Sequence, residues 1–402
     1  MTFVRHPRAP AITAWVSLLL LALVLFFRHL GKFDFVTGEI PQDFAVFLKG
    51  ARLLRQGLSP YEPFEFLTYK YSPGCLLLFY FLPTAPISAW LVTKAVYLTG
   101  WVGALGYGIR VKRWNDFWKL MLGVLISWKG VIECLDYGQF EFSLLVVAFI
   151  AARLFDQRPF WAAIIVGSAP WLKLPWALIA VPFLIRGYLK KSFASVVAGI
   201  ACASALWGLV LPVAWLGWPR YISLLRDWWV VLKIQPFIIF FDHANQSLWA
   251  TMSRILGVDW VPGPVLPDAG YLIRPELLLT SKIFALLLLF LIFCKCVAVT
   301  WRNSKIKSDD EAPEVWVTRW LILILLANPL SWRWASMLLV AVPFVWPKRP
   351  RACHWIGLAG AAICLLLQQN PVVRALGIQH WTVLHDYGLV TYYWLSLLVL
   401  TF

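Results

Sequence analysis

The fold is decided by a polar stretch near the start of a very apolar chain. Residues Gly38 to Pro73 read GEIPQDFAVFLKGARLLRQGLSPYEPFEFLTYKYSP. Pro41 and Asp43 are typical of a helix start, because aspartate is a good N-cap and proline is tolerated in the first turn. Gly57 is a suitable C-terminal stop, so a short helix is predicted between these positions.

This predicted helix has two chemically different faces. Its apolar and basic side chains recur at helical spacing on opposite sides. The apolar side is formed by Phe44, Phe47, Leu48, Ala51 and Leu54, and the basic side by Lys49, Arg52 and Arg55. A helix of this kind lies on a membrane surface and does not cross it. Asp43 at its start is either a helix cap or a catalytic acid, and this segment alone leaves both interpretations open.

The composition of the whole chain indicates a membrane protein. Apolar residues make up 61% of the 402 positions and charged residues only 14%, and the mean hydropathy is +0.72. A soluble domain is about one quarter charged, so the chain is interpreted as a multispanning membrane protein. The seven cysteines are scattered without a C-x-x-C pair, which suggests buried core residues and neither a zinc site nor a disulfide framework.

The apolar runs predict an all-α membrane bundle with about twelve transmembrane helices, because a span needs roughly 20 residues. The predicted spans are Ala11 to Phe27, Ile87 to Ile109, Leu120 to Glu133, Phe140 to Ala152, Phe160 to Ala169, Pro175 to Ile185, Phe193 to Val213, Glu276 to Val299, Val315 to Ala327, Trp334 to Trp346, Trp355 to Gln368, and Tyr387 to Phe402. The first has no small-residue cleavage site after it and is expected to stay as an anchor. Leu76 to Leu82 is too short to cross and is interpreted as a second surface or re-entrant helix.

The distribution of charge orients these spans. If both termini are cytoplasmic, the cytoplasmic loops hold seventeen lysines and arginines against six acids. Most of the net charge of +16 is then the positive-inside signal, and nucleic acid is not expected as a partner. The resulting organisation is one membrane-embedded domain over residues 1–402, with a first outer loop at 28–86 that carries Asp43 and a second at 214–275.

Four further polar clusters fall at the outer ends of spans in this topology. They are Asp136 to Glu141, Trp171 to Pro175, Asn245 to Leu248, and Asn328 to Arg333. Charged groups at membrane depth cost about 3 kcal/mol each, so Lys173 and Arg333 need partners, water or an anionic ligand such as a phosphate. The alternative for each is a side chain that snorkels to the interface.

The other polar residues and the aromatic residues of the outer face are open to two interpretations. Gln139, Glu141, Asn245 and Gln246 are suited equally to substrate binding and to helix caps or interhelical hydrogen bonds. The tryptophans of the second loop are better explained by an interfacial aromatic belt than by sugar-stacking platforms. The outer-face histidines lie beside aspartates without metal-ligand spacing, so no metal is expected.

Several short motifs then share an order along about three quarters of the chain. They are Asp43-Phe44, Gly57-x-Ser59-Pro60-Tyr61, Tyr71-x-Pro73, Gly138-Gln139, Lys173-x-Pro175, Asn245-Gln246-Ser247-Leu248, and Pro329-x-Ser331-Trp332. This order resembles glycosyltransferase family 87 within the GT-C superfamily. Known members are integral membrane mannosyltransferases that use polyprenyl-phosphate-mannose on the outer face of the membrane. The resemblance therefore implies a GT-C-like fold and an inverting transferase with Asp43 as base.

The chain also departs from the family pattern near the expected donor site. Glu141 stands where the family commonly has asparagine, Asn328 where it has serine, and Arg333-Trp334 where a histidine or aspartate follows the Ser-Trp pair. The reaction type is unaffected by these changes. The sugar stays open among mannose, another hexose and a pentose.

Together these observations predict the site and its substrates. Asp43 is the predicted catalytic base, and the predicted substrate-binding residues are Tyr61, Gln139, Glu141, Lys173, Asn245, Gln246, Trp332 and Arg333. The predicted partners are a polyprenyl-phosphate-sugar donor, a glycolipid or glycan acceptor and membrane lipids, with no cofactor. The predicted location is the cytoplasmic membrane, with the active site on its outer, periplasmic or extracellular face.

The rival interpretation is a multispanning transporter or lipid flippase. Such proteins place ionisable residues near mid-membrane, on broken helices in matched halves. Here the acids avoid the interiors of the predicted spans and the two halves do not match. The sequence therefore favours an enzyme.

Overall fold

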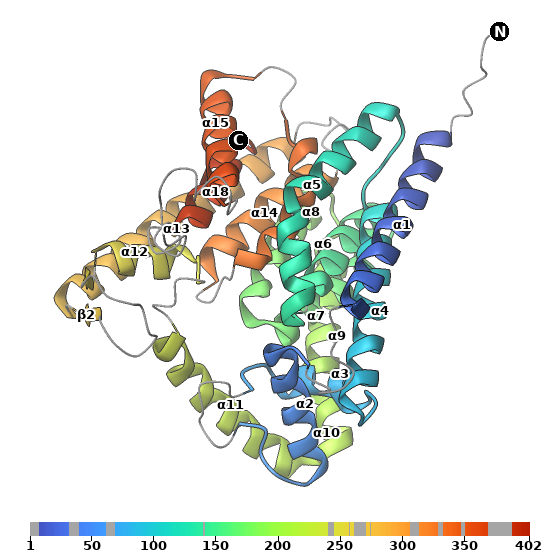
Figure 1. The fold of residues 1–402 in the computed structure, drawn as a ribbon, viewed down its shortest axis with the longest axis vertical. Helices are drawn as coiled ribbons and strands as arrows, with labels where there is room; N and C mark the ends of the chain where they lie inside the picture. Colours follow the sequence, from blue (N-terminus) through green and yellow to red (C-terminus); the bar gives the residue numbers. More distant parts are fainter. Residues whose placement is uncertain are drawn as a thin grey trace.

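The chain forms a helical assembly with one short β-ribbon (Figure 1). The computed structural model describes residues 8–31, 40–61, 69–139, 141–239, 245–256, 258–260, 271–273, 275–305, 313–328, 333–346, 350–368 and 388–402. The elements up to residue 216 are α1 (Ala9–Gly31), α2 (Gln42–Arg55), α3 (Pro73–Tyr80), α4 (Pro86–Gly103), η1 (Ala104–Gly108), α5 (Trp114–Tyr137), α6 (Glu141–Phe155), α7 (Pro159–Leu172), η2 (Leu174–Ile179), α8 (Ala180–Leu189), α9 (Phe193–Ala205), η3 (Leu206–Val210) and α10 (Leu211–Leu216). The later elements are α11 (Trp218–Ile239), α12 (Leu248–Leu256), β1 (Val258–Trp260), β2 (Tyr271–Ile273), α13 (Pro275–Lys305), α14 (Pro313–Ala327), η4 (Arg333–Phe344), α15 (Ala352–Leu367) and α18 (Leu389–Val399). The two strands pair antiparallel, with Asp259 opposite Leu272.

The helices have the composition of membrane spans. Among the described residues, three helical segments are long and apolar enough to cross a membrane, namely Ala9–Arg28, Phe193–Leu216 and Leu279–Lys305. Six shorter apolar helices accompany them, at Pro159–Leu172, Leu174–Leu189, Val315–Ala327, Ala335–Phe344, Ala352–Leu367 and Leu389–Val399. The predicted helical, multispanning membrane fold is confirmed. The number of about twelve spans stays a prediction, because several of these helices are shorter than a bilayer requires.

The arrangement of the helices separates two ends of the molecule. The beginning of α1 and the beginning of α5 lie at one end, whereas α2, α3, α10 and α11 lie at the other (Figure 1). The polar stretch that carries Asp43 is thus far from the basic segment before α5. This is the relation that the positive-inside assignment requires of an outer and an inner loop.

Close helix packing rests on small residues. A Cβ at Gly123 of α5 would lie 1.7 Å from the carbonyl oxygen of Val340 in η4, and one at Gly167 of α7 would lie 2.8 Å from the Cα atom of Ile200 in α9. Neither distance leaves room for a side chain, so backbone meets backbone at both crossings. Such close approach is how helices associate in lipid, where apolar burial alone gives little driving force.

The structure corrects three details of the sequence prediction. The helix of the polar stretch begins at Gln42, with Pro41 as its N-cap, so Asp43 lies in the first turn and is not the cap. The second surface helix begins at Pro73, three residues before the predicted start, because the Ser72 side chain accepts a hydrogen bond from the Cys75 amide. The region predicted as a span from Trp334 is a 3-10 helix.

The predicted stop of the first surface helix is confirmed. Gly57 follows α2 with a φ of +82°, a left-handed conformation that glycine adopts without steric cost. The Leu58 amide donates back to the Leu53 carbonyl at 2.9 Å, which closes the helix end.

Candidate active site

Helix α2 presents Asp43 because its apolar face is buried. Phe44, Phe47, Ala51 and Leu54 are buried, and the Phe47 ring stacks on Phe79 of α3 with centroids 4.4 Å apart. Asp43 lies beside this face and is half-buried. Its carboxylate accepts a hydrogen bond from Gln139 Nε2, a residue 96 positions further along the chain. The acid is therefore engaged across the fold and does not cap its own helix.

The turn between α5 and α6 holds Gln139 against Asp43. Gly138 has a φ of +73°, and a Cβ there would lie 2.6 Å from the Phe44 Cβ, so only glycine fits. The Gln139 amide donates to the Cys134 carbonyl at 2.9 Å, which closes the end of α5. The Gly138-Gln139 motif thus reverses the chain in contact with α2. It places the side-chain amide of Gln139 beside the Asp43 carboxylate.

A second acid and a lysine lie next to this turn. Glu141 opens α6 with only 3% of its surface exposed, and its Oε1 atom lies 3.0 Å from Lys173 Nζ. Lys173 follows α7, and its side chain is also largely buried. A buried ion pair needs both members, since removal of either leaves an uncompensated charge. Two predicted site residues are thereby brought together, and the positive charge of Lys173 is matched by Glu141.

The electrostatics of Asp43 link all of these groups. Burial raises the pKa of the Asp43 carboxyl above its ordinary value, while Lys70 and the hydrogen bond from Gln139 oppose that rise. The charge of Glu141 also raises the pKa of Asp43, and the charge of Lys173 lowers it. A carboxylate with a raised pKa is a stronger base, so the surroundings suit proton abstraction from a hydroxyl group.

Lys70 is the site residue that sequence reasoning missed. Burial lowers the pKa of its ammonium group to about 8. The charge of Lys173 lowers this pKa further, and the charges of Asp43 and Glu141 oppose the change. The available signal was its position, between Tyr69 and Tyr71 and just before the Ser-Pro pair at the end of the polar stretch. Nothing local to the sequence shows that this lysine faces an aspartate 27 residues earlier.

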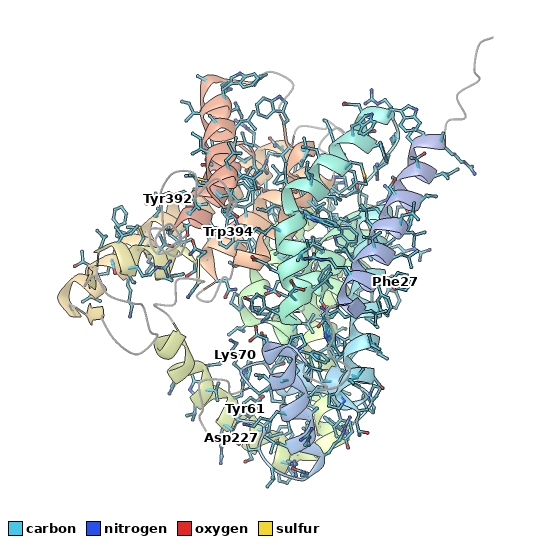
Figure 2. All side chains as sticks on the ribbon, in the orientation of Figure 1. Phe27, Tyr61, Lys70, Asp227, Tyr392 and Trp394 are labelled. Atoms are coloured by element: carbon cyan, nitrogen blue, oxygen red, sulfur yellow. The ribbon has the colours of Figure 1, made fainter. Side chains whose placement is uncertain are left out.

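The other motif residues of the first loop fix its path. Ser59 Oγ donates to Asp227 Oδ2 of α11 at 2.8 Å, and the Tyr61 hydroxyl donates to the Tyr71 carbonyl at 2.8 Å. Figure 2 shows Tyr61, Lys70 and Asp227 at the end of the molecule that carries α2 and α11. Tyr61 is buried with its hydroxyl committed to the backbone, so its geometry is that of a support for the loop.

The Asn245-Gln246 pair lies in a different network. Gln246 Oε1 accepts from the Val390 amide at 3.2 Å, and the Gln246 carbonyl accepts from Thr391 Oγ1 at 2.7 Å. The Asn245 side-chain oxygen accepts from the Ser247 amide at 3.2 Å. These bonds begin α12 and attach it to α18.

The remaining predicted residues can be placed only in part. Trp332 and the side chain of Arg333 lie outside the described residues, so their substrate contacts stay predictions. In the second loop, Trp218 and Trp229 of α11 are 56% and 58% exposed, whereas Trp228 and Trp249 donate to backbone carbonyls. Exposed tryptophans on one helix fit the predicted interfacial belt.

The chemistry available at the Asp43 cluster is acid-base and electrostatic. Within the described part of the chain, no group of three His, Cys, Asp or Glu side chains is placed to hold a metal ion. The cluster offers the Asp43 carboxylate, which can accept a proton, and two lysines, of which Lys173 is paired with Glu141. These are the groups needed when a hydroxyl attacks a carbon that carries a phosphate leaving group.

Comparison with known proteins gives one match. A family model described as glycosyltransferase family 87 matches residues 69–329, which is more than half of the 402 residues. The matched part contains Lys70, Gln139, Glu141 and Lys173, while Asp43 lies before it. No curated protein and no solved structure matches the chain.

Proposed function

The chain belongs to glycosyltransferase family 87, and from this premise we propose that it is an inverting membrane glycosyltransferase that uses a polyprenyl-phosphate-linked sugar. The acceptor in this proposal is a lipid or glycan hydroxyl on the outer face of the cytoplasmic membrane. Membership in a glycosyltransferase family favours this function over transport. The observation that carries the mechanism is the Asp43 carboxylate, which accepts a hydrogen bond from Gln139 and whose pKa is lowered by the charge of Lys70.

The proposed reaction needs one proton transfer and one displacement. Asp43 accepts the proton of the acceptor hydroxyl as that oxygen forms a bond to the anomeric carbon. The bond from the anomeric carbon to the phosphate oxygen breaks, and polyprenyl phosphate leaves with the electron pair. A positioned base contributes about a hundredfold to ten-thousandfold to such a step. A nearby positive charge stabilises the negative charge that develops on the leaving phosphate.

An apolar groove beside the cluster supports a lipid-linked donor. The groove has a volume of about 440 Å³ and lies between α3, α4 and α6, with Phe79, Tyr97, Phe142 and Val146 in its lining. Phe142 follows Glu141 directly, and Phe79 stacks on Phe47 one turn along α2 from Asp43. A hydrocarbon chain in this groove would therefore approach the acid cluster. We propose that it holds the isoprenoid chain of the donor.

The proposal is tested by transfer assays on the purified protein. Radiolabelled mannose, another hexose and a pentose are supplied as polyprenyl-phosphate conjugates and, in parallel, as nucleotide conjugates, with extracted membrane lipids as acceptors. We expect transfer from the lipid-linked donors alone. Transfer from nucleotide sugars but not from lipid-linked sugars would overturn the donor class. Mass spectrometry of lipids from cells without the protein then identifies the acceptor and the sugar.

The proposed sidedness is tested with single cysteines at Leu58 and Asn115. Both side chains are exposed and lie in the polar stretch and at the start of α5, respectively. In a background without native cysteines, an impermeant thiol reagent should label position 58 in intact cells and position 115 only after permeabilisation. The opposite pattern would place the Asp43 cluster on the cytoplasmic side.

A further inference from the structure

The chain on either side of Lys70 is packed into an aromatic core. The flanking Tyr69 and Tyr71 are both buried, and their rings lie 6.2 and 5.0 Å from the Phe47 ring of α2. Lys70 itself is only partly buried. Phe47 lies one turn along α2 from Asp43, so this packing places the segment around Lys70 beside the first turns of the helix that carries Asp43.

Three successive backbone carbonyls in this segment are bound by aromatic side chains. Trp228 Nε1 of α11 donates to the Lys70 carbonyl at 3.0 Å. The Tyr61 hydroxyl donates to the Tyr71 carbonyl at 2.8 Å, and the Tyr69 hydroxyl donates to the Ser72 carbonyl at 3.2 Å. Tyrosine and tryptophan combine an apolar body with one donor, which lets them fix backbone at a buried junction. The lysine between them is therefore presented from a rigid support.

The charges around Lys70 are arranged in two acid-lysine sets. Lys173 Nζ lies 3.0 Å from Glu141 Oε1. Of the two lysines, Lys70 has the larger effect on the pKa of Asp43. Proton transfer to Asp43 during the proposed reaction neutralises that carboxylate. At the same step negative charge appears on the leaving phosphate. A cation that faces Asp43 then remains balanced throughout, provided that the phosphate lies within its reach.

We propose that Lys70 binds the phosphate of the lipid-linked donor and stabilises its charge as the phosphate leaves. This inference rests on the proposed function, and it gives Lys70 the role that the sequence suggested for Lys173 and Arg333. Lys173 is held by Glu141 and supports the site. Because phosphate charge grows in the transition state, Lys70 contributes more to turnover than to donor binding.

Binding of farnesyl phosphate, with farnesol as the matched probe without phosphate, tests this role directly. The full-length protein in detergent is compared with Lys70→Gln, Lys70→Arg and, as a control on the exposed face of α2, Lys49→Gln. We expect the wild-type protein to bind farnesyl phosphate more tightly than farnesol. Lys70→Gln should lose about tenfold or more of that preference, as expected for one charge-assisted hydrogen bond. Lys70→Arg and Lys49→Gln should keep most of it.

Chemical labelling provides a second measurement that needs no variant to fold. An amine-specific reagent is applied at pH 8, and the modification of Lys70 and Lys49 is quantified by mass spectrometry. Farnesyl phosphate should protect Lys70 severalfold and leave Lys49 unchanged, and farnesol should protect neither residue. Equal modification of Lys70 with and without farnesyl phosphate would overturn its role.

The outcomes separate this inference from the function on which it rests. If the wild-type protein does not prefer farnesyl phosphate to farnesol, the polyprenyl-phosphate donor fails and the role of Lys70 fails with it. If the wild-type protein shows the preference and Lys70→Gln shows it equally, the donor stands and Lys70 is excluded from the phosphate site.

Discussion

Two polar clusters, both singled out by sequence motifs, have opposite characters. The cluster around Asp43 holds two acids and two lysines at the junction of α2, α5, α6 and α7. The cluster around Gln246 is neutral, apart from Arg254, and its side chains bond to backbone and to one another between α12 and α18. The first cluster joins ionisable groups that can change charge. The second provides hydrogen-bond partners for backbone groups at the ends of helices.

From this difference we infer that the Asp43 cluster serves chemistry and that the Gln246 network serves the architecture of the fold. Buried neutral groups are stable once each donor and acceptor is paired, and they then fix one packing arrangement. Ionisable groups that face each other in a half-buried position shift each other's proton affinity, which is typical of reactive sites. We therefore expect substitutions in the Asp43 cluster to change turnover, and those in the Gln246 network to change stability.

Asp43→Asn should have the largest effect on transfer. The amide is nearly isosteric but cannot accept the acceptor proton, so we expect turnover to fall about a hundredfold to ten-thousandfold. Specific activity is measured on the purified variant with a short-chain lipid-linked donor. A matched acid elsewhere, Asp116→Asn in the first turn of α5, serves as control and should keep full turnover. Near-normal turnover of Asp43→Asn would reduce Asp43 to a structural residue.

Lys173→Met should chiefly reduce stability, because it leaves the buried Glu141 carboxylate without its partner. Breaking a buried ion pair costs about 3 kcal/mol or more, while replacing both members by apolar residues is often neutral. We expect a lower thermal unfolding midpoint for the single variant and recovery in the Lys173→Met, Glu141→Met double variant. If the double variant regains stability but no transfer, Lys173 or Glu141 also takes part in the reaction.

Gln246→Ala should lower stability and spare turnover. Its side chain accepts from the Val390 amide across 144 residues of sequence, and an unsatisfied buried donor costs about 1–3 kcal/mol. The folded fraction, separated by size-exclusion chromatography, should transfer sugar at the wild-type specific rate. A selective loss of turnover at unchanged stability would instead support the substrate-binding role that the sequence suggested for Gln246.

The sequence predicts local structure well and the site only in part. The apolar face of α2 and its stop at Gly57 follow from helical spacing and from glycine's access to left-handed backbone. The contacts that build the site join residues far apart, such as Asp43 and Gln139, or Glu141 and Lys173. The spacing of residues along the sequence cannot predict contacts between positions so far apart. For the same reason Lys70, whose proposed role depends on Asp43 and on Trp228, carries no recognisable local pattern.

The smallest predicted effect is on the pH dependence of kcat/KM for the donor, which should be bell-shaped. On the acidic side activity should fall as Asp43 becomes protonated, at a pH above the usual aspartate range because burial raises the pKa of this carboxyl. On the basic side it should fall near pH 8, because the Lys70 ammonium, whose pKa is lowered to about 8, then loses its charge.

The basic limb is assigned by a single substitution. The charges of Asp43, Glu141 and Lys173 act on the pKa of Lys70, and α11 adds Asp227, which bonds to Ser59 of the same loop. Burial raises the pKa of Tyr61, Tyr69 and Tyr71 well above that of free tyrosine, so these neighbours stay protonated near pH 8. An arginine side chain keeps its positive charge throughout the pH range of such a profile. Lys70→Arg should therefore move the basic limb to higher pH and leave the acidic limb in place, whereas an unmoved basic limb would assign that titration to another group.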